Sequence, residues 1–414
     1  MMLFQTGQAK RRQGPRGRVD RSLLLAVLGL ACVGVVMVAS SSIAVTHRHH
    51  VGEFYFLRKH LVFLTIGLIA AGVAIRTELK LLEKYAFLLM AVAFVLLILV
   101  FVPHLGVRIN GARRWLNLDL CVFQPMEAVK LILVIYIASY LVRHREDVET
   151  RFLGLFKPVM VAIVIVLPLF MQPDFGSAIL VIAVTIITMW LGGARSLFLG
   201  LMGLPLMPAL LLAATSESYR MKRLTSFLDP WKDPLNDGFQ LTQSLMAIGR
   251  GEWFGVGLGS SIFKLSYLPE AHTDFIFAVI GEELGLTGIV AVMALFAIVL
   301  WRGLYMGLKG ISVGQHFAGY VAFGLSLMIG LQAMVSMGVN LGVLPTKGLT
   351  LPLISYGGSS MVMTCLMLGV LLRATFEINR ALDTRQSTKP ESGEAKKASA
   401  RRAAVLPECD AKAA

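Results

Sequence analysis

Long apolar runs alternate with short polar segments along almost the whole chain of 414 residues. A membrane-spanning helix needs roughly 20 consecutive apolar residues, whereas the strands of a membrane β-barrel are shorter and alternate in polarity. The pattern therefore predicts an all-α fold, a polytopic integral membrane helical bundle of about ten transmembrane helices. The ten runs cover residues 22–45, 59–75, 85–103, 125–142, 158–172, 176–193, 196–214, 274–301, 314–337 and 358–376.

Polar segments flank this bundle at both ends of the chain. Residues 1–21 form a basic arm, and the first apolar run ends in ASSSIA, whose small residues resemble a signal-peptide cleavage site. The run nevertheless has full membrane length and the arm is long for a signal peptide, so we expect a retained first span. Residues 22–380 are then the transmembrane domain. Residues 381–414, rich in Ala, Lys and Ser, are expected to form a disordered cytoplasmic tail.

The charges between the runs predict the orientation. Lysine and arginine are enriched in the cytoplasmic loops of membrane proteins, and an even number of spans places both termini on that same, cytoplasmic side. Two loops on the opposite side, 104–124 and 215–273, also carry clustered cations. Such cations indicate anionic ligands outside the membrane, although long loops translocate regardless of charge. The expected cytoplasmic loops, each with Lys or Arg, are 76–84, 143–157, 192–195 and 302–310.

The composition supports the membrane assignment and excludes other classes. Of all residues, 56% are hydrophobic and 15% charged, against roughly a quarter charged in soluble domains. The net charge of +14 would suit a nucleic-acid partner. The basic residues cluster beside the membrane runs instead, so we expect no nucleic acid to bind. The four cysteines show no metal-ligand spacing, and we assign no metal-ligating residues and no disulfide.

The loop 215–273 is the only sizeable segment outside the membrane besides the two ends. It is too short and irregular to bury a core of its own, so we expect it to lie as a cap on the bundle. Within it, LTQSLMAIGRG at 241–251 predicts a short amphipathic helix that ends at glycines. GVGLGSS at 255–261 is rich in glycine, but it lacks the pattern and the preceding strand of a phosphate-binding loop.

The acidic residues where this loop meets the next apolar run are the main candidates for chemistry. Glu270, His272 and Asp274 lie together there. Acidic groups at a membrane surface are costly unless they are solvated, paired or used. Asp274 also fits a structural role as the cap of a helix, and the residues alone leave the two roles balanced. His272 suits either a proton relay or packing.

Other polar residues at helix ends have structural interpretations as well. Asp174, in the turn QPDFGS, fits a helix N-cap. Glu127 and Lys130 fit an i,i+3 ion pair at the end of a span. Glu282 and Glu283, about two turns into an apolar run, are expected to form hydrogen bonds between helices.

The segment VNLGVLPTKGLTLPLISYGGSS, residues 339–360, leads into the last apolar run. Ser355, Gly358 and Ser359 stand at the start of that run, where free backbone N–H groups and the helix dipole favour an anion. The same small residues equally suit close packing of helices. Lys347 lies in the loop before them and is a candidate to bind the same anion.

Six motifs, in this order, resemble the SEDS family (shape, elongation, division and sporulation) of integral-membrane glycosyltransferases that polymerise lipid II. The resemblance covers residues 22–380 and is strongest to the cell-division branch of the family. The chain departs from the usual pattern at Met126, Ala128 and Glu252. The motifs are NGARRWLNL at 110–118, FQPMEAVKL at 123–131, QPDFGSA at 172–178, RLTSFLDPWKDP at 223–234, LPEAHTDFIFAVIGEELGLTG at 268–288 and LPLISYGGSS at 351–360.

The resemblance implies a catalytic role for Asp274, which matches the catalytic aspartate of the family. It would act as a general base on a sugar hydroxyl while undecaprenyl pyrophosphate leaves. The charge of that leaving group implies nearby cations, and a divalent cation, Mg²⁺ or Mn²⁺, is a candidate cofactor. The cations considered are Arg220, Arg223, Lys264 and Lys347, with Arg113 and Arg114 behind them. The other substrate-binding candidates are Glu270, His272, Ser355, Gly358 and Ser359, and the supporting residues are Glu127, Lys130 and Asp174.

The resemblance also implies partners and a location. The substrate is expected to be lipid II in the inner (cytoplasmic) membrane of a bacterium, at the division septum. A cognate class B penicillin-binding protein, which is a transpeptidase, and other divisome proteins are the expected partners. Two alternatives use the same features: a flippase that moves lipid II across the membrane, and a non-enzymatic scaffold of the divisome.

Overall fold

The computed structural model describes residues 18–49, 52, 54–109, 111–117, 122–215, 218–266, 268–345 and 348–388. The predicted arm at 1–17 and the tail from residue 389 onward lie outside these ranges. The helices are α1 (Arg21–His49), α2 (Tyr55–Arg76), α3 (Leu79–Leu99), α4 (Pro125–Arg143), α5 (Arg145–Thr150), α6 (Phe152–Met171), α7 (Phe175–Leu191), α8 (Ser196–Thr215), α9 (Ser218–Leu228), the 3-10 turn η1 (Pro230–Lys232), α10 (Phe239–Arg250), α11 (Phe263–Ser266), α12 (Ile276–Ser312), α13 (His316–Asn340) and α14 (Gly358–Thr388).

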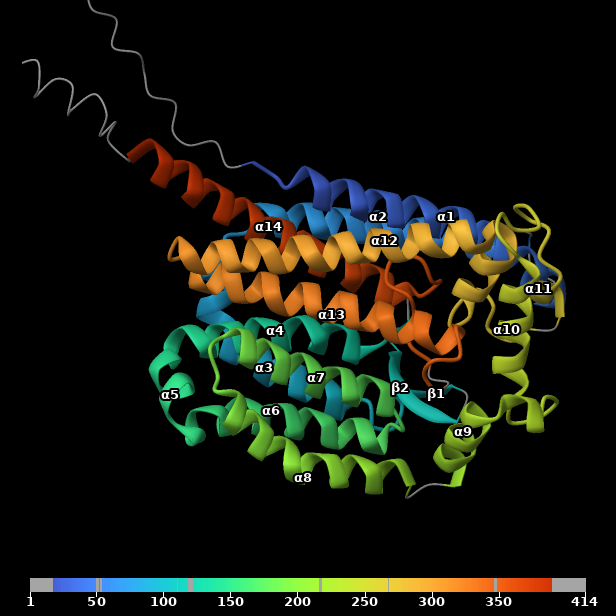
Figure 1. The fold of residues 1–414 in the computed structure, drawn as a ribbon, viewed down its shortest axis with the longest axis horizontal. Helices are drawn as coiled ribbons and strands as arrows, with labels where there is room; N and C mark the ends of the chain where they lie inside the picture. Colours follow the sequence, from blue (N-terminus) through green and yellow to red (C-terminus); the bar gives the residue numbers. More distant parts are fainter. Residues whose placement is uncertain are drawn as a thin grey trace, which may run out of the picture.

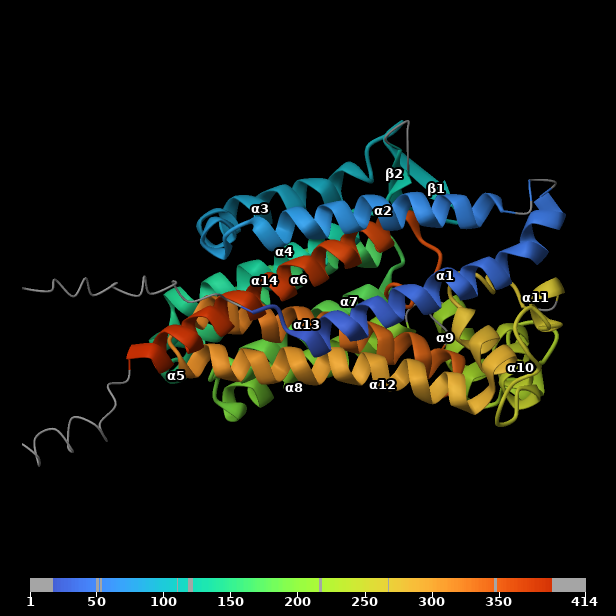
Figure 2. The same ribbon diagram turned by 90° about the horizontal axis from the view of Figure 1, so that it is seen from above.

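Long helices run side by side along the length of the molecule (Figures 1 and 2), which confirms the prediction of an all-α bundle. Each of the ten predicted apolar runs overlaps one helix, although five of the runs extend one to four residues beyond a helix end. Among the described residues, eight helices are long and apolar enough to cross a membrane, and α7 is a shorter apolar helix of 17 residues. The count of ten crossings stays a prediction.

Two helices, α4 and α13, form the centre of the bundle. In their most apolar stretches 83% and 78% of the residues are buried, against 17% in α2 and 22% in α3. Because lipid is as apolar as leucine, close packing rather than hydrophobicity must hold such helices together. In α13, Gly324 and Gly330 lie directly against Val134 of α4 and Leu300 of α12. The peripheral helices α2 and α3 instead present wide apolar faces outward.

The described ends of the chain meet at one end of the bundle. Near the start of α1, Asp20 is ion-paired with Arg302 of α12, and the carbonyl oxygen of Arg18 accepts a 2.9 Å hydrogen bond from Asn379 of α14. The opposite end carries α9, α10 and α11 (Figure 1). As predicted, the segment 215–273 covers that end, and the predicted amphipathic helix corresponds to α10. We call this the pocket end, for the cavity described below.

A small antiparallel sheet, which the apolar pattern does not predict, folds the segment between α3 and α4. It consists of β1 (Gly106–Ile109), β2 (Ala112–Asn117) and β3 (Val122–Phe123), in the order β1-β2-β3. Trp115 pairs with Val107, and Leu116 pairs with Phe123. Hydrogen bonds within the sheet satisfy a backbone that could not stay unpaired beside a membrane.

The prediction that 302–310 is a loop was wrong. Helix α12 continues through this segment to Ser312, and Gly314, with a φ of 83°, follows its end. The polarity of the chain changes at Arg302, but the helix itself continues. The end of a helix is set by the backbone, for example by a glycine with positive φ. An apolar run in the sequence indicates only the part of the helix that is buried or faces lipid.

Helix α12 is broken near its other end, at Gly285, whose φ is 65° and ψ is −161°. The residues around the break form backbone hydrogen bonds with the loop after α10 instead of with their own helix. The N–H groups of Val256 and Gly257 donate to the carbonyl oxygens of Glu282 and Glu283. The glycine-rich loop is therefore a packing element, because its backbone lies directly on the backbone of α12.

Replacing Gly251 should destabilise this junction. A Cβ at position 251 would lie 1.8 Å from the carbonyl oxygen of Gly281, a backbone atom that no rotamer change can move. We expect Gly251→Ala to lower the free energy of unfolding by about 1–3 kcal/mol. Gly249→Ala is the matched control, since nothing lies within 4 Å of its Cβ position. Thermal unfolding midpoints in detergent compare the two variants, and equal midpoints would contradict the packing described here.

Candidate active site

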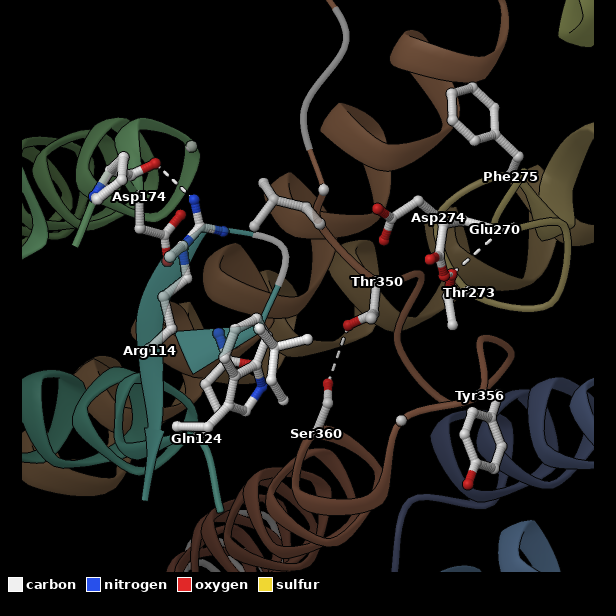
Figure 3. A pocket seen from close by; sticks show the side chains of 18 of the residues that line it. Arg114, Gln124, Asp174, Glu270, Thr273, Asp274, Phe275, Thr350, Tyr356 and Ser360 are labelled. Atoms are coloured by element: carbon white, nitrogen blue, oxygen red, sulfur yellow. Dashed lines mark hydrogen bonds between the residues drawn. The ribbon is translucent and has the colours of Figure 1, made fainter. Parts of the chain in front are cut away.

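A pocket of about 730 Å³ opens at the pocket end of the bundle. This volume is in the range of sites for small molecules. Its walls come from segments far apart in the sequence, namely strand β2, the start of α7, helix α9, and the loops before α12 and α14. Figure 3 shows Arg114 and Asp174 on one side, Asp274 and Glu270 on the other, and Thr350 and Ser360 between them.

Asp274 lies in the loop directly before α12, and its side chain lines the pocket. Burial raises the pKa of Asp274 to about 7; the carboxylate of Glu270 also raises it, and the cations Arg114 and Arg223 lower it. A carboxylate that titrates near neutral pH suits proton transfer, because it is a stronger base than an ordinary aspartate and is still ionised in a large fraction of molecules.

The opposite loop approaches Asp274 closely at Gly348. A Cβ at this position would lie 2.8 Å from Oδ2 of Asp274. The missing side chain therefore leaves the space that the carboxylate occupies. Gly348 belongs to the segment between α13 and α14, which also supplies Leu349 and Thr350 to the pocket.

The backbone that carries Asp274 is held by hydrogen bonds to three consecutive carbonyl oxygens. The N–H of Tyr356 donates to His272 at 2.9 Å, and the hydroxyl of Ser355 donates to Thr273 at 2.6 Å. The side-chain amide of Asn340 donates to the carbonyl oxygen of Asp274 at 3.0 Å. All three donors belong to the segment 340–356, which we call the clasp.

Asn340 also fixes the start of α12. It is fully buried at the end of α13, and its side-chain oxygen accepts a 3.1 Å hydrogen bond from the N–H of Ala278. That N–H lies in the first turn of the helix and is shared with the carbonyl oxygen of Phe275, also at 3.1 Å. One side chain therefore joins the end of α13, the start of α12 and the backbone of Asp274.

Only some of the cations predicted to face an anionic substrate line the pocket. Arg223 and Arg114 line the pocket. Arg114 is held in place because its guanidinium donates to the carbonyl oxygens of Gln172, at 2.9 Å, and Pro173, at 2.5 Å. Lys347 and the side chain of Arg220 lie outside the described part of the chain.

Lys264 does not reach the pocket. It is 3% exposed, and its ammonium group donates to Glu283 at 2.6 Å and to Ser40 of α1 at 2.9 Å. Breaking such a buried pair would leave a charge without a partner, which is strongly unfavourable. The geometry therefore corrects its assignment as a pyrophosphate ligand and gives it a role in joining α1, α11 and α12.

Glu282, next to Glu283, has a different set of partners. It accepts hydrogen bonds from Arg250 and from the N–H of Ile262, at 2.8 and 3.0 Å, and from the hydroxyl of Ser261. Both glutamates are fully buried beside the break in α12. The predicted bonds between helices are found for Glu283, with α1 and α11, and for Glu282, with Arg250 of α10, while Ser261 and Ile262 belong to a loop.

A row of small and hydroxylated residues forms another wall. Gly358 and Ser359, at the start of α14, line the pocket as the anion-site hypothesis requires. The hydroxyls of Thr350 and Ser360 lie 3.0 Å apart and also face the pocket. Ser355 does not line it, since its hydroxyl is used in the clasp.

The remaining predicted residues surround the site. Asp174 lines the pocket and caps α7 by accepting a 3.3 Å hydrogen bond from the N–H of Ser177. His272 lies behind the pocket wall, with its ring 5.1 Å from that of Phe56 and 5.6 Å from that of Tyr356. Glu270 lines the pocket and accepts a 2.7 Å hydrogen bond from Thr273.

The pair Glu127 and Lys130 is buried in α4, 2.8 Å apart, and does not line the pocket. Lys130 also donates to Gln332 of α13 at 2.9 Å, and Gln332 donates to the carbonyl oxygen of Thr350 at 2.9 Å. The ion pair therefore supports the pocket wall through two hydrogen bonds.

Sequence reasoning missed Asn340, Gly348 and Thr350 as residues of the site. All three stand in the quoted segment 339–360, but an amide, a glycine and a threonine carry no charge that marks them. Arg114 was considered only as a secondary cation. Neighbouring residues of a strand face opposite sides, so a predicted strand at this position would have indicated that only one of Arg113 and Arg114 faces the pocket.

The described residues do not include a group of three or more His, Cys, Asp or Glu side chains that could hold a metal ion. The donor set for a protein-held Mg²⁺ or Mn²⁺ site is therefore not found in this part of the chain. The pocket carboxylate of Asp274 lies near the cations Arg114 and Arg223.

Comparisons with known proteins agree along nearly the whole chain. Residues 21–380 match the profile of the FtsW/RodA/SpoVE family, described as "Cell cycle protein". The probable peptidoglycan glycosyltransferase FtsW of Xanthomonas oryzae pv. oryzae is 51% identical over 94% of this chain and 80% of that protein. The protein of the same name from Legionella pneumophila subsp. pneumophila is 46% identical, over 88% of this chain and 92% of its own.

Solved structures resemble the fold. A chain from a peptidoglycan synthase complex, whose structure concerns the coordination of polymerization and crosslinking, is 31% identical with a TM-score of 0.71. The match covers 87% of this chain and 98% of that one. The rod shape determining protein RodA of Thermus thermophilus is 27% identical with a TM-score of 0.62, over 86% and 96% of the two chains.

The clasp predicts a specific loss of stability. Ser355→Ala removes a buried hydroxyl that donates to Thr273 and accepts a 2.8 Å hydrogen bond from the N–H of Leu351. We expect a cost of about 1–3 kcal/mol, because two backbone groups lose their partner. Ser336→Ala is the control, since that buried hydroxyl has no hydrogen-bond partner among the described residues. Thermal unfolding midpoints that fall equally in both variants would contradict the clasp.

Proposed function

Because this chain belongs to the FtsW/RodA/SpoVE family of cell cycle proteins, we propose that its pocket polymerises lipid II with Asp274 as the general base. The chain is a multi-pass membrane protein and a peptidoglycan glycosyltransferase of cell division. The single observation that carries the catalytic proposal is a pocket carboxylate whose pKa is raised to about 7.

The reaction is one displacement at a sugar carbon. The 4-hydroxyl of one disaccharide attacks the anomeric carbon of the next, and its proton passes to the carboxylate of Asp274. As the new carbon–oxygen bond forms, the bond to the pyrophosphate breaks, and undecaprenyl pyrophosphate leaves with the electron pair. Attack opposite an α-linked leaving group gives a β-glycosidic bond, so a second, nucleophilic carboxylate is not needed. Asp274 later releases its proton to water.

The charges of the pocket support this assignment of roles. Arg114 and Arg223 face the same cavity as Asp274, and fixed cations stabilise the charge that develops on a leaving pyrophosphate. The guanidinium of Arg114 is already oriented by two backbone carbonyls, so little reorganisation is needed when the substrate binds. The start of α14, with Gly358 and Ser359, adds backbone N–H groups on the same wall.

Arg220 and Lys347 remain proposed as further ligands of the pyrophosphate. A divalent cation, Mg²⁺ or Mn²⁺, also remains a proposal, and no step above depends on it. Glu270 would act indirectly, by raising the basicity of Asp274 and by ordering Thr273.

We further propose that the pocket end faces outward from the inner membrane, at the division septum, and that a class B penicillin-binding protein works with the chain. The positive charge of the loops at the opposite end supports this orientation. The partner proposal is supported by the similarity to a chain from a peptidoglycan synthase complex that combines polymerization with crosslinking. Other divisome proteins are expected to join the same assembly.

Replacing the base tests the mechanism directly. We expect Asp274→Asn to reduce polymerisation of labelled lipid II in proteoliposomes by about 10²–10⁴-fold, the usual contribution of a general base. The exposed Glu252 does not line the pocket, so Glu252→Gln should keep full activity. Glycan chain length on gels gives the rate.

Other outcomes of this experiment identify the alternatives. Full activity of Asp274→Asn would contradict its role as base. Transfer of lipid II between leaflets without chain growth would indicate a flippase. No polymerisation by the wild-type protein, even with the transpeptidase added, would indicate a scaffold.

The pH dependence tests the electrostatics of the base. Only ionised Asp274 accepts a proton, so kcat/KM should rise with pH through a midpoint near 7. Glu270→Gln removes a negative neighbour that raises the pKa, and the midpoint should move to lower pH. A shift of about half to one unit would increase the relative rate at pH 6 about two- to fivefold. An unchanged midpoint, or one that moves upward, would contradict the proposed pairing, and Glu252→Gln again serves as the control.

A further inference from the structure

Two of the most exposed aromatic side chains of the molecule stand side by side on the glycine-rich loop after α10. Trp253 is 68% exposed and Phe254 is 82% exposed. We call this pair the aromatic tip. Exposed aromatic groups of this size are unfavourable in water unless something covers them, and neither residue lines the pocket.

The aromatic tip is held rigidly against α12. The carbonyl oxygens of Glu252 and Trp253 accept hydrogen bonds from the N–H groups of Leu286 and Thr287, at 2.9 and 3.1 Å. These donors directly follow the break in α12, where the helix cannot supply their partners. The exposure of the tip is therefore a fixed feature of the fold.

An apolar stripe continues from the tip down α12. Its members recur every three to five residues, so they share one face of the helix, and each is exposed to between 36% and 64%. The sequence contains no charged residue between Glu283 and Arg302. The members of the stripe are Leu286, Val290, Met293, Ile298 and Trp301.

The length of this stripe matches a membrane. Arg302 lies seventeen positions after Gly285 in the chain. At 1.5 Å per residue this is about 26 Å, close to the roughly 30 Å of a bilayer's hydrocarbon core. At the far end, Trp301 and Tyr305 are exposed beside the cations Arg302 and Lys309. That combination is typical of a membrane–water interface.

The polarity reverses on the other side of the break. Glu282 and Glu283 are buried in ion pairs immediately before Gly285, while the stripe begins immediately after it. The break thus separates a part of α12 that is buried on all sides within the protein from a part that has an exposed apolar face.

We propose that the aromatic tip is inserted in the bilayer leaflet on the pocket side and that the break at Gly285 marks the surface of that leaflet. Tryptophan is favoured at this level because its ring is apolar and its N–H can still reach water or headgroups. The tip then completes a lipid-facing surface that runs from one interface to the other along α12.

This placement fixes the height of the pocket. The segment Ile276–Leu284 stands between the tip and Asp274 and is about 13 Å long as a helix. Asp274 is thereby carried on a rigid support anchored at the membrane surface. This consequence rests on the proposed function, because it matters only if the substrate is a lipid. The insertion of the aromatic tip is independent of that function.

Quenching of tryptophan fluorescence by brominated lipids tests the insertion. The full-length protein is reconstituted in phosphatidylcholine vesicles that carry bromine either high or low on the acyl chains. The chain has five tryptophans. Trp253→Phe should remove one tryptophan's share of the emission that the brominated lipids quench, and this loss should be larger when the bromine is high on the acyl chains. Trp231→Phe is the matched control, because Trp231 is 56% exposed in the same segment and should be in water.

A gain-of-signal variant keeps the test decisive. Phe254→Trp should add a tryptophan that is quenched by the same lipids. Unquenched emission from both position 253 and position 254 would overturn the proposal. If that emission instead responds only when the transpeptidase is added, the tip is a protein-docking surface, which also overturns insertion. None of these readouts depends on glycosyltransferase activity, so a failed mechanism would leave them interpretable.

Discussion

Three hydrogen bonds to consecutive carbonyl oxygens, at His272, Thr273 and Asp274, fix the position of the proposed base. A loop at this position would otherwise leave its backbone groups unpaired, which is costly when they are shielded from water. The donors come from one segment, so the loop with Asp274 and the loop with Gly348 cannot move independently. The pocket between them keeps its shape because both walls share these bonds.

Burial has opposite consequences for the acidic residues of this region. Glu282 and Glu283 are buried among donors and cations that satisfy them, and they serve to join helices. Asp274 is half-buried in the pocket wall and has no direct salt bridge among the described residues, and its desolvation raises its pKa. A group that is destabilised in its charged form is a good proton acceptor. The desolvation of the charged carboxylate therefore makes Asp274 more basic, whereas ion pairs offset this desolvation at Glu282 and Glu283.

The sequence predicts the helices well because membrane thickness imposes a length on every apolar run. It also identifies Asp274, Glu270 and Arg223, since charged residues at a membrane surface are rare enough to be noticed. It fails for Lys264, because a lysine in a loop looks identical whether it faces a cavity or a buried glutamate. Asn340 and Gly348 are missed for the related reason that their roles depend on distant neighbours. Asn340 binds residues 62 and 66 positions away in the chain, and Gly348 faces Asp274, which is 74 positions away.

The break in α12 connects these observations. In an unbroken helix, Glu282 and Glu283 would face lipid. The N–H groups of Leu286 and Thr287 would also be used within the helix, so the loop after α10 would lose its hydrogen-bond donors. With Gly285 in a conformation that only glycine adopts easily, the helix divides into a part with an exposed apolar face and a part that is buried in the pocket end of the bundle. The second part begins at Ile276, directly after the loop with Asp274, and is held by Asn340 at its start and by two ion-paired glutamates at its end. Asp274 is therefore held at a fixed height above the membrane surface. The sugar of a lipid-linked substrate must reach the base at that height.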